Sequence, residues 1–304
     1  MKERSLSKGR EVFQDRDKFV IVKKKRIACK EIEKFANKER SLGYHFGVLK
    51  LDVKTKTATG VEFSSGGTST TESGKVSGNL ETKYKVKDLG LTVTEKWTTE
   101  NDLNTTLDVQ DKLMPGLKLS LDTKFTPASG SLGGKVSAEY KHDTATVCAD
   151  LDLGLTALNA SAVVGHKGWL AGYTTSFDID KTFKIWKHHF GLGYSAPDFV
   201  LHTSVANGTE FGGSVYQKVS PSLETGVNLG WSSATSSTSF GIGAKYNLED
   251  GAALRAKINN KSELGLGYQQ KLRDGVTVTL STLVNSGNFS AGGHKVGLAL
   301  EMTA

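Results

Sequence analysis

The sequence predicts an all-β protein, and specifically a transmembrane β-barrel. Residues 43–304 alternate apolar and polar side chains over segments about ten residues long, which is typical of half-exposed strands. Glycine-rich turn signals separate these segments. No run approaches the ~18 consecutive apolar residues of a transmembrane helix, so a helical membrane protein is excluded.

Composition divides the chain near Gly43. Residues 1–42 hold fourteen Lys and Arg against seven Asp and Glu, and only one glycine, Gly9. The remainder holds 25 basic and 25 acidic residues and 33 of the 34 glycines, so the formal charge of +7 belongs to the first segment. We therefore expect a basic N-terminal segment over 1–42 and one β-rich domain over 43–304.

The first predicted strand shows the alternation clearly. Leu49, Leu51 and Val53 fall on one face, and charged residues fall between them. The same pattern returns in KLSLDTKF at 118–125, in ETGVNLGW, in FGIGAKY and in KVGLALEM near the C-terminus. Each segment is expected to form a strand with one apolar and one polar face.

Turn signals between the segments predict an antiparallel meander. They include Ser129-Gly130, Ala206-Asn207-Gly208, Glu249-Asp250-Gly251, Arg273-Asp274-Gly275 and Asn285-Ser286-Gly287. At roughly 10 residues per strand plus a short turn, the chain has room for some 18 to 20 strands. A closed ring of that size is too wide for side chains to fill, so its interior holds water. The polar face then points inward and the apolar face toward lipid, which predicts a water-filled pore.

The predicted inner wall is charged. Lysines there would raise the local concentration of anions, although acids share the same face and the barrel segment as a whole is neutral. The residues predicted to line the pore are Lys50, Asp52, Lys54, Lys118, Asp122, Lys124, Lys218, Lys245, Lys257 and Lys295.

One carboxylate breaks the pattern. In LTVTEKW the apolar face runs Leu91, Val93, Glu95, Trp97, which sets Glu95 among side chains that should meet acyl chains. An ionised group there costs up to a few kcal/mol, so we expect it to be protonated, shielded by water or contacted by a partner. The alternative is a local bulge that turns Glu95 inward.

The sequence offers little support for an enzyme. It has no GxxxxGK[ST], HExxH or GxSxG motif, and its seven histidines are scattered. Cys29 and Cys148 make no disulfide framework or zinc cluster, so we expect no metal site and no cofactor. The basic stretch at 23–40 is diluted by acids, which disfavours nucleic acid as a partner. Residues 1–42 lack the apolar core of a secretory signal, so we expect no cleaved signal within them.

Several motifs resemble those of one family. TEKW at 94–97, GWLAGY at 168–173, NGTEFGGSVYQKV at 207–219, GLGY at 265–268 and AGGHKVGL at 291–298 are similar to the mitochondrial porins, the voltage-dependent anion channels. The resemblance implies a barrel of nineteen strands, a number that the periodicity alone does not select. It also implies that the first and last strands run parallel.

The resemblance also implies a function. Members are voltage-gated, weakly anion-selective diffusion channels of the mitochondrial outer membrane, and they pass ions, ATP, ADP and small metabolites. Their implied partners are membrane lipid, hexokinase-type and apoptosis-regulating proteins, and further copies of the same chain. A barrel that conducts little and serves as a scaffold for partners is the alternative.

The resemblance further assigns residues. Glu95 matches a position implicated in gating and in partner contacts facing the membrane. Lys295, Gly297, Leu300 and Met302 match the family's sorting signal for the mitochondrial outer membrane. The positions that match nucleotide contacts are Lys8, Glu263, Leu264, Gly265, Ser281, Thr282, Leu283, Val284 and Asn285. Glu263 and Asn285 depart from the family's usual residues there.

The N-terminal segment departs from the family. Members carry a short helix inside the pore, which residues 5–14 could retain, and a YGFG-like stretch that Tyr44–Gly47 matches. Some thirty residues then separate the two, where the family allows a handful. The segment is either helical or disordered. It either still folds into the pore with a basic insert at one mouth, or is displaced and leaves the pore without its usual plug.

Overall fold

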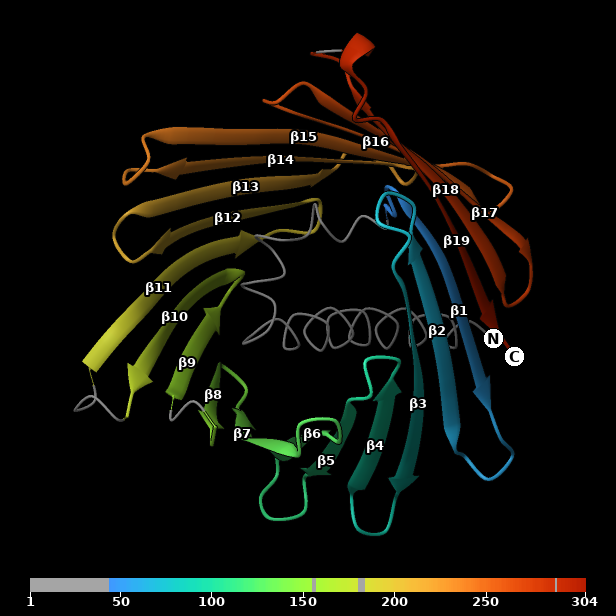
Figure 1. The fold of residues 1–304 in the computed structure, drawn as a ribbon. Coiled ribbons are helices and arrows are strands. Elements are labelled where there is room, and N and C mark those ends of the chain that lie inside the picture. Colours follow the sequence, from blue (N-terminus) through green and yellow to red (C-terminus); the bar gives the residue numbers. More distant parts are fainter. Residues whose placement is uncertain (1–43, 155–156, 180–183, 288) are drawn as a thin grey trace, which may run out of the picture.

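A computed structural model describes residues 44–154, 157–179, 184–287 and 289–304, and these residues form a single closed ring of strands (Figure 1). The predicted N-terminal segment, with its helix at 5–14, lies outside the described residues. The ring contains nineteen strands, which confirms the all-β barrel and the strand number that the family resemblance implies.

The strands follow one another along the chain with short connections. Their bounds are β1 Val48–Lys56, β2 Glu62–Thr70, β3 Val76–Val86, β4 Leu91–Thr98, β5 Leu103–Gln110, β6 Leu117–Thr126, β7 Ser131–Lys141, β8 Ala145–Asp152, β9 Ala157–His166, β10 Trp169–Asp178, β11 Lys184–Ser195, β12 Phe199–Ala206, β13 Glu210–Lys218, β14 Leu223–Ser232, β15 Ser237–Asn247, β16 Ala252–Asn259, β17 Glu263–Arg273, β18 Val276–Asn285 and β19 Lys295–Thr303. A short 3₁₀ turn, η1 Phe289–Ala291, precedes β19.

Closure of the ring depends on one parallel pair. Every strand pairs antiparallel with the next along the chain, and β1 pairs parallel with β19. In that pair Leu51 lies opposite Leu300, and Asp52 lies opposite Glu301. Figure 1 shows blue β1 beside red β19. An odd number of strands in a meander makes this pair parallel, because consecutive strands reverse direction each time.

Each predicted turn lies where one strand ends and the next follows, and three of the motifs begin at the last residue of a strand. Asn207 and Gly208 connect β12 to β13 with φ of 52° and 68°, the left-handed conformation that an Asn-Gly hairpin turn requires. The positive φ of Gly275, 79°, serves the turn from β17 to β18 in the same way. These turns are short enough to keep sequence neighbours adjacent in the ring.

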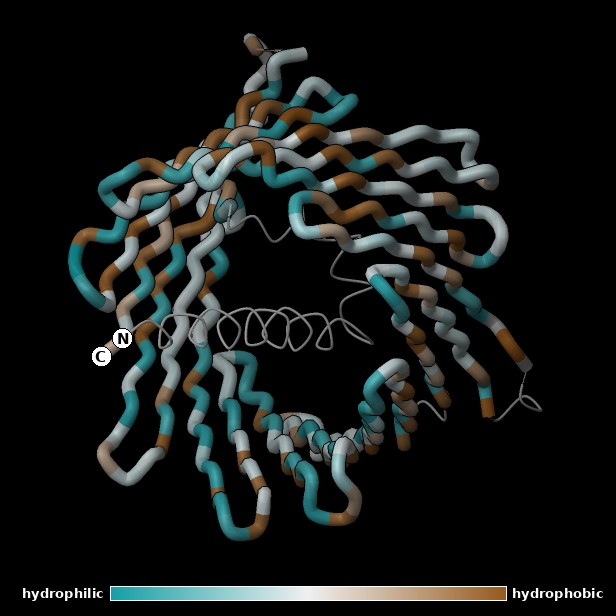
Figure 2. Tube along the Cα trace, turned by 180° about the vertical axis from the view of Figure 1, so that it is seen from behind, coloured by the Kyte–Doolittle hydropathy of each residue, from teal (hydrophilic) through white to brown (hydrophobic). Residues whose placement is uncertain are grey.

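The two faces of the sheet differ in character. Rows that contain Leu49, Trp97 and Leu229 expose large apolar side chains, whereas the alternate rows carry Lys, Asp, Ser and Thr. Figure 2 shows the alternation of hydrophobic and hydrophilic residues along each strand. Residues 44–47, which lead into β1, contact the polar face and lie on the inner side of the ring (Figure 1), so the polar face is the inner one. The apolar face is then the one that meets lipid.

Neighbouring residues on β7 provide a test of this assignment. Val136 pairs with Leu121 and Leu151 on the outer face, and Ser137 lies on the inner face opposite Ser120 and Asp150. We predict that Val136→Arg destabilises the barrel in vesicles by about 2–4 kcal/mol, because it places a cation in hydrocarbon. Ser137→Arg, the matched control, should cost less than about 1 kcal/mol, because its side chain reaches water.

The measurement is reversible unfolding of both variants from phospholipid vesicles in denaturant. Equal destabilisation by the two substitutions, or a larger effect of Ser137→Arg, would show that the faces are assigned the wrong way round.

Candidate functional site

The candidate site is the inner wall of the barrel. The register joins the ten residues predicted to line the pore into rows on one face: Lys50 lies opposite Thr68, Lys118 opposite Glu139, and Lys245 opposite Arg255. Each predicted position lies on the same side of its strand as its partner in the neighbouring strand. The structure therefore places all ten on the inner wall, while their part in selectivity stays a prediction.

Four of these lysines are held by carboxylates. Lys50 Nζ lies 2.6 Å from Asp52, and Lys118 Nζ lies 3.1 Å from Asp108. Lys124 Nζ lies 2.9 Å from Asp102, while Lys295 Nζ lies 3.0 Å from Glu72. A lysine that is paired in this way adds little net field at a distance, because the carboxylate cancels most of it.

Hydroxyl groups donate hydrogen bonds to the carboxylates on the inner face of β5 and β6. Thr106 Oγ1 donates a hydrogen bond to Asp122 at 2.6 Å, and Ser120 Oγ donates to Asp108 at 2.5 Å. These bonds fix the carboxylates against the wall of β5 and β6. The predicted residue Asp122 is thus bound by a hydroxyl rather than by a lysine in the pairs that the structure describes.

Three other predicted lysines have a different environment. Within the part of the chain that the structure describes, Lys54, Lys218 and Lys245 have no carboxylate oxygen within ion-pair distance. Glu224 of β14 is the register neighbour of both Lys218 and Lys245, so one acid faces two lysines. These positions supply positive charge that the nearby acids do not fully neutralise. Lys257 lies against aromatic rings.

The positions assigned to nucleotide contacts by resemblance divide between the two faces. Gly265, Ser281 and Leu283 occupy inner rows of β17 and β18, with Gly265 directly opposite Leu283. Leu264, Thr282 and Val284 alternate with them and belong to the outer face. Lys8 lies outside the described residues. These assignments stay predictions, and only the inner-row members adjoin the interior.

Two of the inner-row positions are already in contact with the chain before β1. Ser281 Oγ accepts a hydrogen bond from the His45 backbone N–H at 3.1 Å. A Cβ added at Gly265 would lie 2.7 Å from Cζ of Phe46, so the Phe46 ring covers this glycine. At the start of β17, Glu263 accepts a hydrogen bond from the Asn259 side chain at 2.7 Å.

Glu95 lies on the outer face. The register of β4 runs without a shift from Leu91 to Trp97 against both neighbouring strands, so no bulge turns the carboxylate inward. Glu95 lies between Thr82 of β3 and Thr105 of β5, and its side chain is exposed. Thr123 of β6 lies next to Thr105. Glu95 is therefore the charged member of a polar row that crosses β3–β6 on the lipid side.

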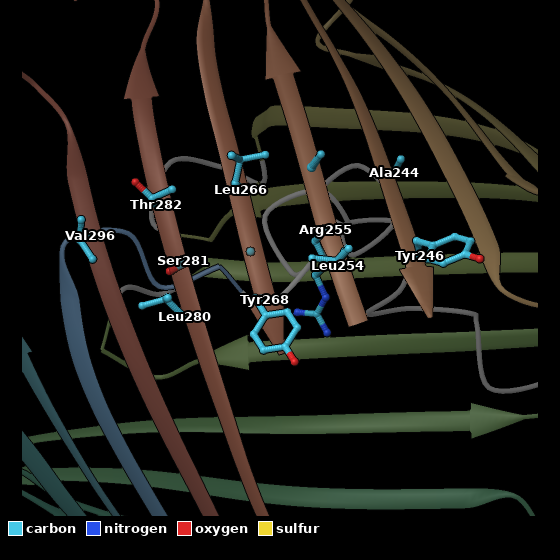
Figure 3. A pocket seen from close by; sticks show the side chains of 12 residues that line it. Ala244, Tyr246, Leu254, Arg255, Leu266, Tyr268, Leu280, Ser281, Thr282 and Val296 are labelled. Carbon is cyan, nitrogen blue, oxygen red and sulfur yellow. The ribbon is translucent and has the colours of Figure 1, made fainter. Parts of the chain in front are cut away.

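A groove of about 600 Å³ also lies on the outer face, across β15–β19 (Figure 3). It forms where two small residues, Ala244 and Ala256, face each other across neighbouring strands. Tyr246 and Tyr268 stand along one side of it. Most of the lining side chains belong to outer rows, so the groove opens to lipid, although the inner-row residues Arg255, Gly267 and Ser281 also line it.

Two inner-wall features were not singled out from the sequence. Arg255 alternates with Lys257 on β16, so the spacing of two residues could have placed both on one face. Arg255 donates a hydrogen bond to the Gln269 side chain. The contact of Tyr44 and Phe46 with β16 and β17 joins residues more than 200 positions apart, and no local pattern signals it.

Comparison with known proteins then settles the family. The family model described as "Eukaryotic porin" matches residues 27–297. The chain belongs to the eukaryotic porin family. Over 266 residues it is 57% identical to the voltage-dependent anion-selective channel of Drosophila melanogaster, covering 87% of this chain and 94% of the relative.

Vertebrate porins are similar at nearly the same level. The chain is 54% identical over 264 residues to the non-selective voltage-gated ion channel VDAC2 of Xenopus laevis, covering 86% of this chain and 93% of that one. The family found in this way agrees with the resemblance in the motifs. A solved mutant of Rh. blastica porin aligns with a TM-score of 0.48 at 11% identity, over 75% of this chain and 89% of that chain.

Two negative findings apply to the described residues alone. No helix among them is both long and apolar enough to cross a membrane. No group of three or more His, Cys, Asp or Glu side chains among them is arranged to hold a metal ion.

Glu95 gives a prediction about stability. Glu95→Gln should stabilise the porin in vesicles at pH 8 by about 1 kcal/mol or more, because it replaces a carboxylate beside lipid with a neutral amide. Glu81→Gln, one strand away on the inner face, is the control and should not stabilise. Denaturant unfolding from vesicles measures both. A neutral or destabilising Glu95→Gln would mean that the carboxylate is fully hydrated at this position.

Asp102, in the turn before β5, gives a prediction about how stability depends on pH. The pKa of this carboxyl is lowered mainly by the hydrogen bond that Thr126 Oγ1 donates at 2.6 Å, and to a smaller extent by the contact with Lys124. A folded-state pKa below the unfolded one stabilises the protein above the unfolded pKa, and that contribution is lost as pH falls through the folded pKa.

We therefore predict that wild-type stability declines below about pH 4, and that Asp102→Asn and Thr126→Ala each flatten this decline. Unfolding midpoints measured between about pH 5 and pH 2 would show it. An acid profile for Asp102→Asn that matches the wild type would contradict the assignment.

Proposed function

We propose that this porin is a voltage-gated, weakly anion-selective diffusion channel of the mitochondrial outer membrane that passes ions, nucleotides and small metabolites. The observation that carries the proposal is the closed nineteen-stranded ring with a charged inner wall and an apolar outer wall. The names of the relatives, which describe voltage-dependent or voltage-gated channels, support it. Transport of this kind needs positioned charge and water and no catalytic group.

The mitochondrial location is part of the proposal. It rests on the resemblance of Lys295, Gly297, Leu300 and Met302 in β19 to the sorting signal of the family. The test is the location in cells of this porin fused to a fluorescent protein. The fusion should reach the mitochondrial outer membrane, and a variant with Gly297 and Met302 replaced should not. If the altered protein still reached the mitochondrial outer membrane, these residues would not be the sorting signal.

Anion selectivity has a definite source in this proposal. Lys54, Lys218 and Lys245, which have no described ion pair, project positive charge into the interior, whereas the Lys118–Asp108 pair contributes almost no net field. The same positive potential would raise the local concentration of nucleotides and phosphorylated metabolites in the pore, as it does that of chloride. The inner-row positions Gly265, Ser281 and Leu283 are where a nucleotide contact on β17 and β18 is proposed.

Partner binding is a separate part of the proposal. The polar row at Thr82, Glu95, Thr105 and Thr123 places one carboxylate and three hydroxyl groups on the outer face, where acyl chains offer them no hydrogen bonds. We assign to it the contacts with hexokinase-type proteins, apoptosis-regulating proteins or another copy of the chain that the resemblance implies. If Glu95→Gln left gating, oligomerisation and partner binding all unchanged, this assignment would fail.

Planar-bilayer recording tests the channel function and its selectivity. We predict a conducting pore whose reversal potential in a KCl gradient reports a preference for chloride. Lys218→Gln with Lys245→Gln should lower that preference, because two positive charges are lost from the wall. The paired change Lys118→Gln with Asp108→Asn, the matched control, should leave the reversal potential close to the wild type, because it is neutral overall.

Failure of the wild-type protein to conduct would favour the alternative, a scaffold that binds partners on its outer face and passes little. A conducting pore in which the neutral pair change lowers selectivity as much as the double lysine change would contradict the charge assignment while leaving the channel function intact.

A further inference from the structure

The segment that enters β1 lies along the inner wall and brings two aromatic rings to it. The rings of Tyr44 and Phe46 stack with centroids 4.9 Å apart and planes 24° apart. The ammonium of Lys257, on β16, lies 4.9 Å from the centroid of Tyr44 and 5.0 Å from that of Phe46. Both distances are within the range of a cation–π interaction, so one lysine engages both rings.

Glycines on the neighbouring strand make room for these rings. Gly265 and Gly267 lie opposite Lys257 and Arg255 in the β16–β17 pair. An added Cβ would lie 2.7 Å from the Phe46 ring at Gly265 and 3.1 Å from the Tyr44 ring at Gly267. Both spaces are therefore filled by the rings, and a larger side chain would push the rings away from the wall.

The backbone of the segment is fixed as well. The His45 N–H donates to Ser281 Oγ at 3.1 Å, and a side chain at Gly297 would overlap the His45 carbonyl oxygen. Thr71 donates to the Gly47 carbonyl from its backbone N–H and from its hydroxyl, each at 2.9 Å. The segment is thus anchored to β18, to β19 and to the residue that follows β2, which holds the rings in place over Lys257.

We infer that Tyr44 and Phe46 form an aromatic cap that shields Lys257 from anions in the pore, so that the segment before β1 limits how much this one lysine contributes to anion binding. The inference rests on the proposed channel function. The rings present their negative π faces to the ammonium, and an anion that binds Lys257 must compete with that attraction. Lys218 and Lys245 carry the same charge with no such ring contact among the described residues.

The cap predicts a coupling between the rings and the lysine. The probe is inorganic tripolyphosphate, which carries high negative charge and no nucleobase, and the readout is the concentration that halves the conductance of the full chain in a planar bilayer. Tyr44→Leu with Phe46→Leu should tighten block by about two- to fivefold, the factor that corresponds to the usual strength of an exposed cation–π contact.

Lys257 should affect block by tripolyphosphate only when the two rings no longer cover it. Lys257→Gln alone should change block by less than about twofold, and it should abolish the tighter block when combined with the two leucine substitutions. Lys218→Gln, the matched control, should weaken block by the same factor with or without the rings. A purely structural effect of the rings would persist after Lys257→Gln, which would overturn the inference.

Two further variants guard against misfolding. Tyr44→Phe keeps the ring and should behave as the wild type does. Gly267→Val leaves both rings in the chain but fills the space beneath Tyr44, so it should tighten block as the leucine pair does. Unchanged block in Gly267→Val and in the leucine pair, in channels of normal KCl conductance, would overturn the cap and leave the channel function standing. A wild-type protein that forms no channel would overturn the channel function itself.

Discussion

The fold depends on one constraint, which is that no backbone polar group can remain unpaired in hydrocarbon. A meander of strands satisfies this everywhere except at its two edges. Here the edges are β1 and β19, and their parallel pairing from Leu49–Leu298 to Lys54–Thr303 removes both. An odd strand number requires that the closing pair be parallel, and parallel pairing is slightly weaker per residue than antiparallel pairing. The inner face next to this closure is also where the segment before β1 is anchored.

Closure of the barrel separates a water-filled interior from the surrounding lipid, and the side chains on each face differ accordingly. The inner face balances lysines against carboxylates and hydroxyls on β1–β8, so most of the charge there cancels locally. On β13 and β15 two lysines face one acid, and these lysines, together with Lys54 of β1, are the proposed source of selectivity. On β16 a lysine is covered by aromatic rings, which limits its contribution. The outer face carries a carboxylate at Glu95, which is costly to place beside lipid unless a partner or water contacts it.

The alternation of residues was enough to predict the strands and their faces, and the glycine-containing motifs between them predicted the turns. Leu49 and Lys50 could be assigned to opposite faces from period two alone, because a strand reverses its side-chain direction at each residue. The strand number and the parallel closure needed the family, since periodicity allowed 18 to 20 strands. What the sequence could not show were the contacts across closure: the Lys295–Glu72 pair and the cover of Gly265 by Phe46 join residues more than 200 apart. Residues 1–42 carry the net charge, and the predictions made for them stay predictions.

Cross-linking of β1 to β19 tests the closed barrel most directly. In a background with Cys29→Ser and Cys148→Ser, Asp52→Cys with Glu301→Cys places two thiols on directly opposed residues of the inner face. Neighbouring strands are about 4.8 Å apart, within the range that a disulfide spans. Asp52→Cys with Ala299→Cys moves one thiol by two residues and separates the Cα atoms by about 8 Å, beyond that range. We predict rapid disulfide formation in vesicles for the first pair only. Formation in the second pair alone, or in neither, would contradict a barrel closed in this register.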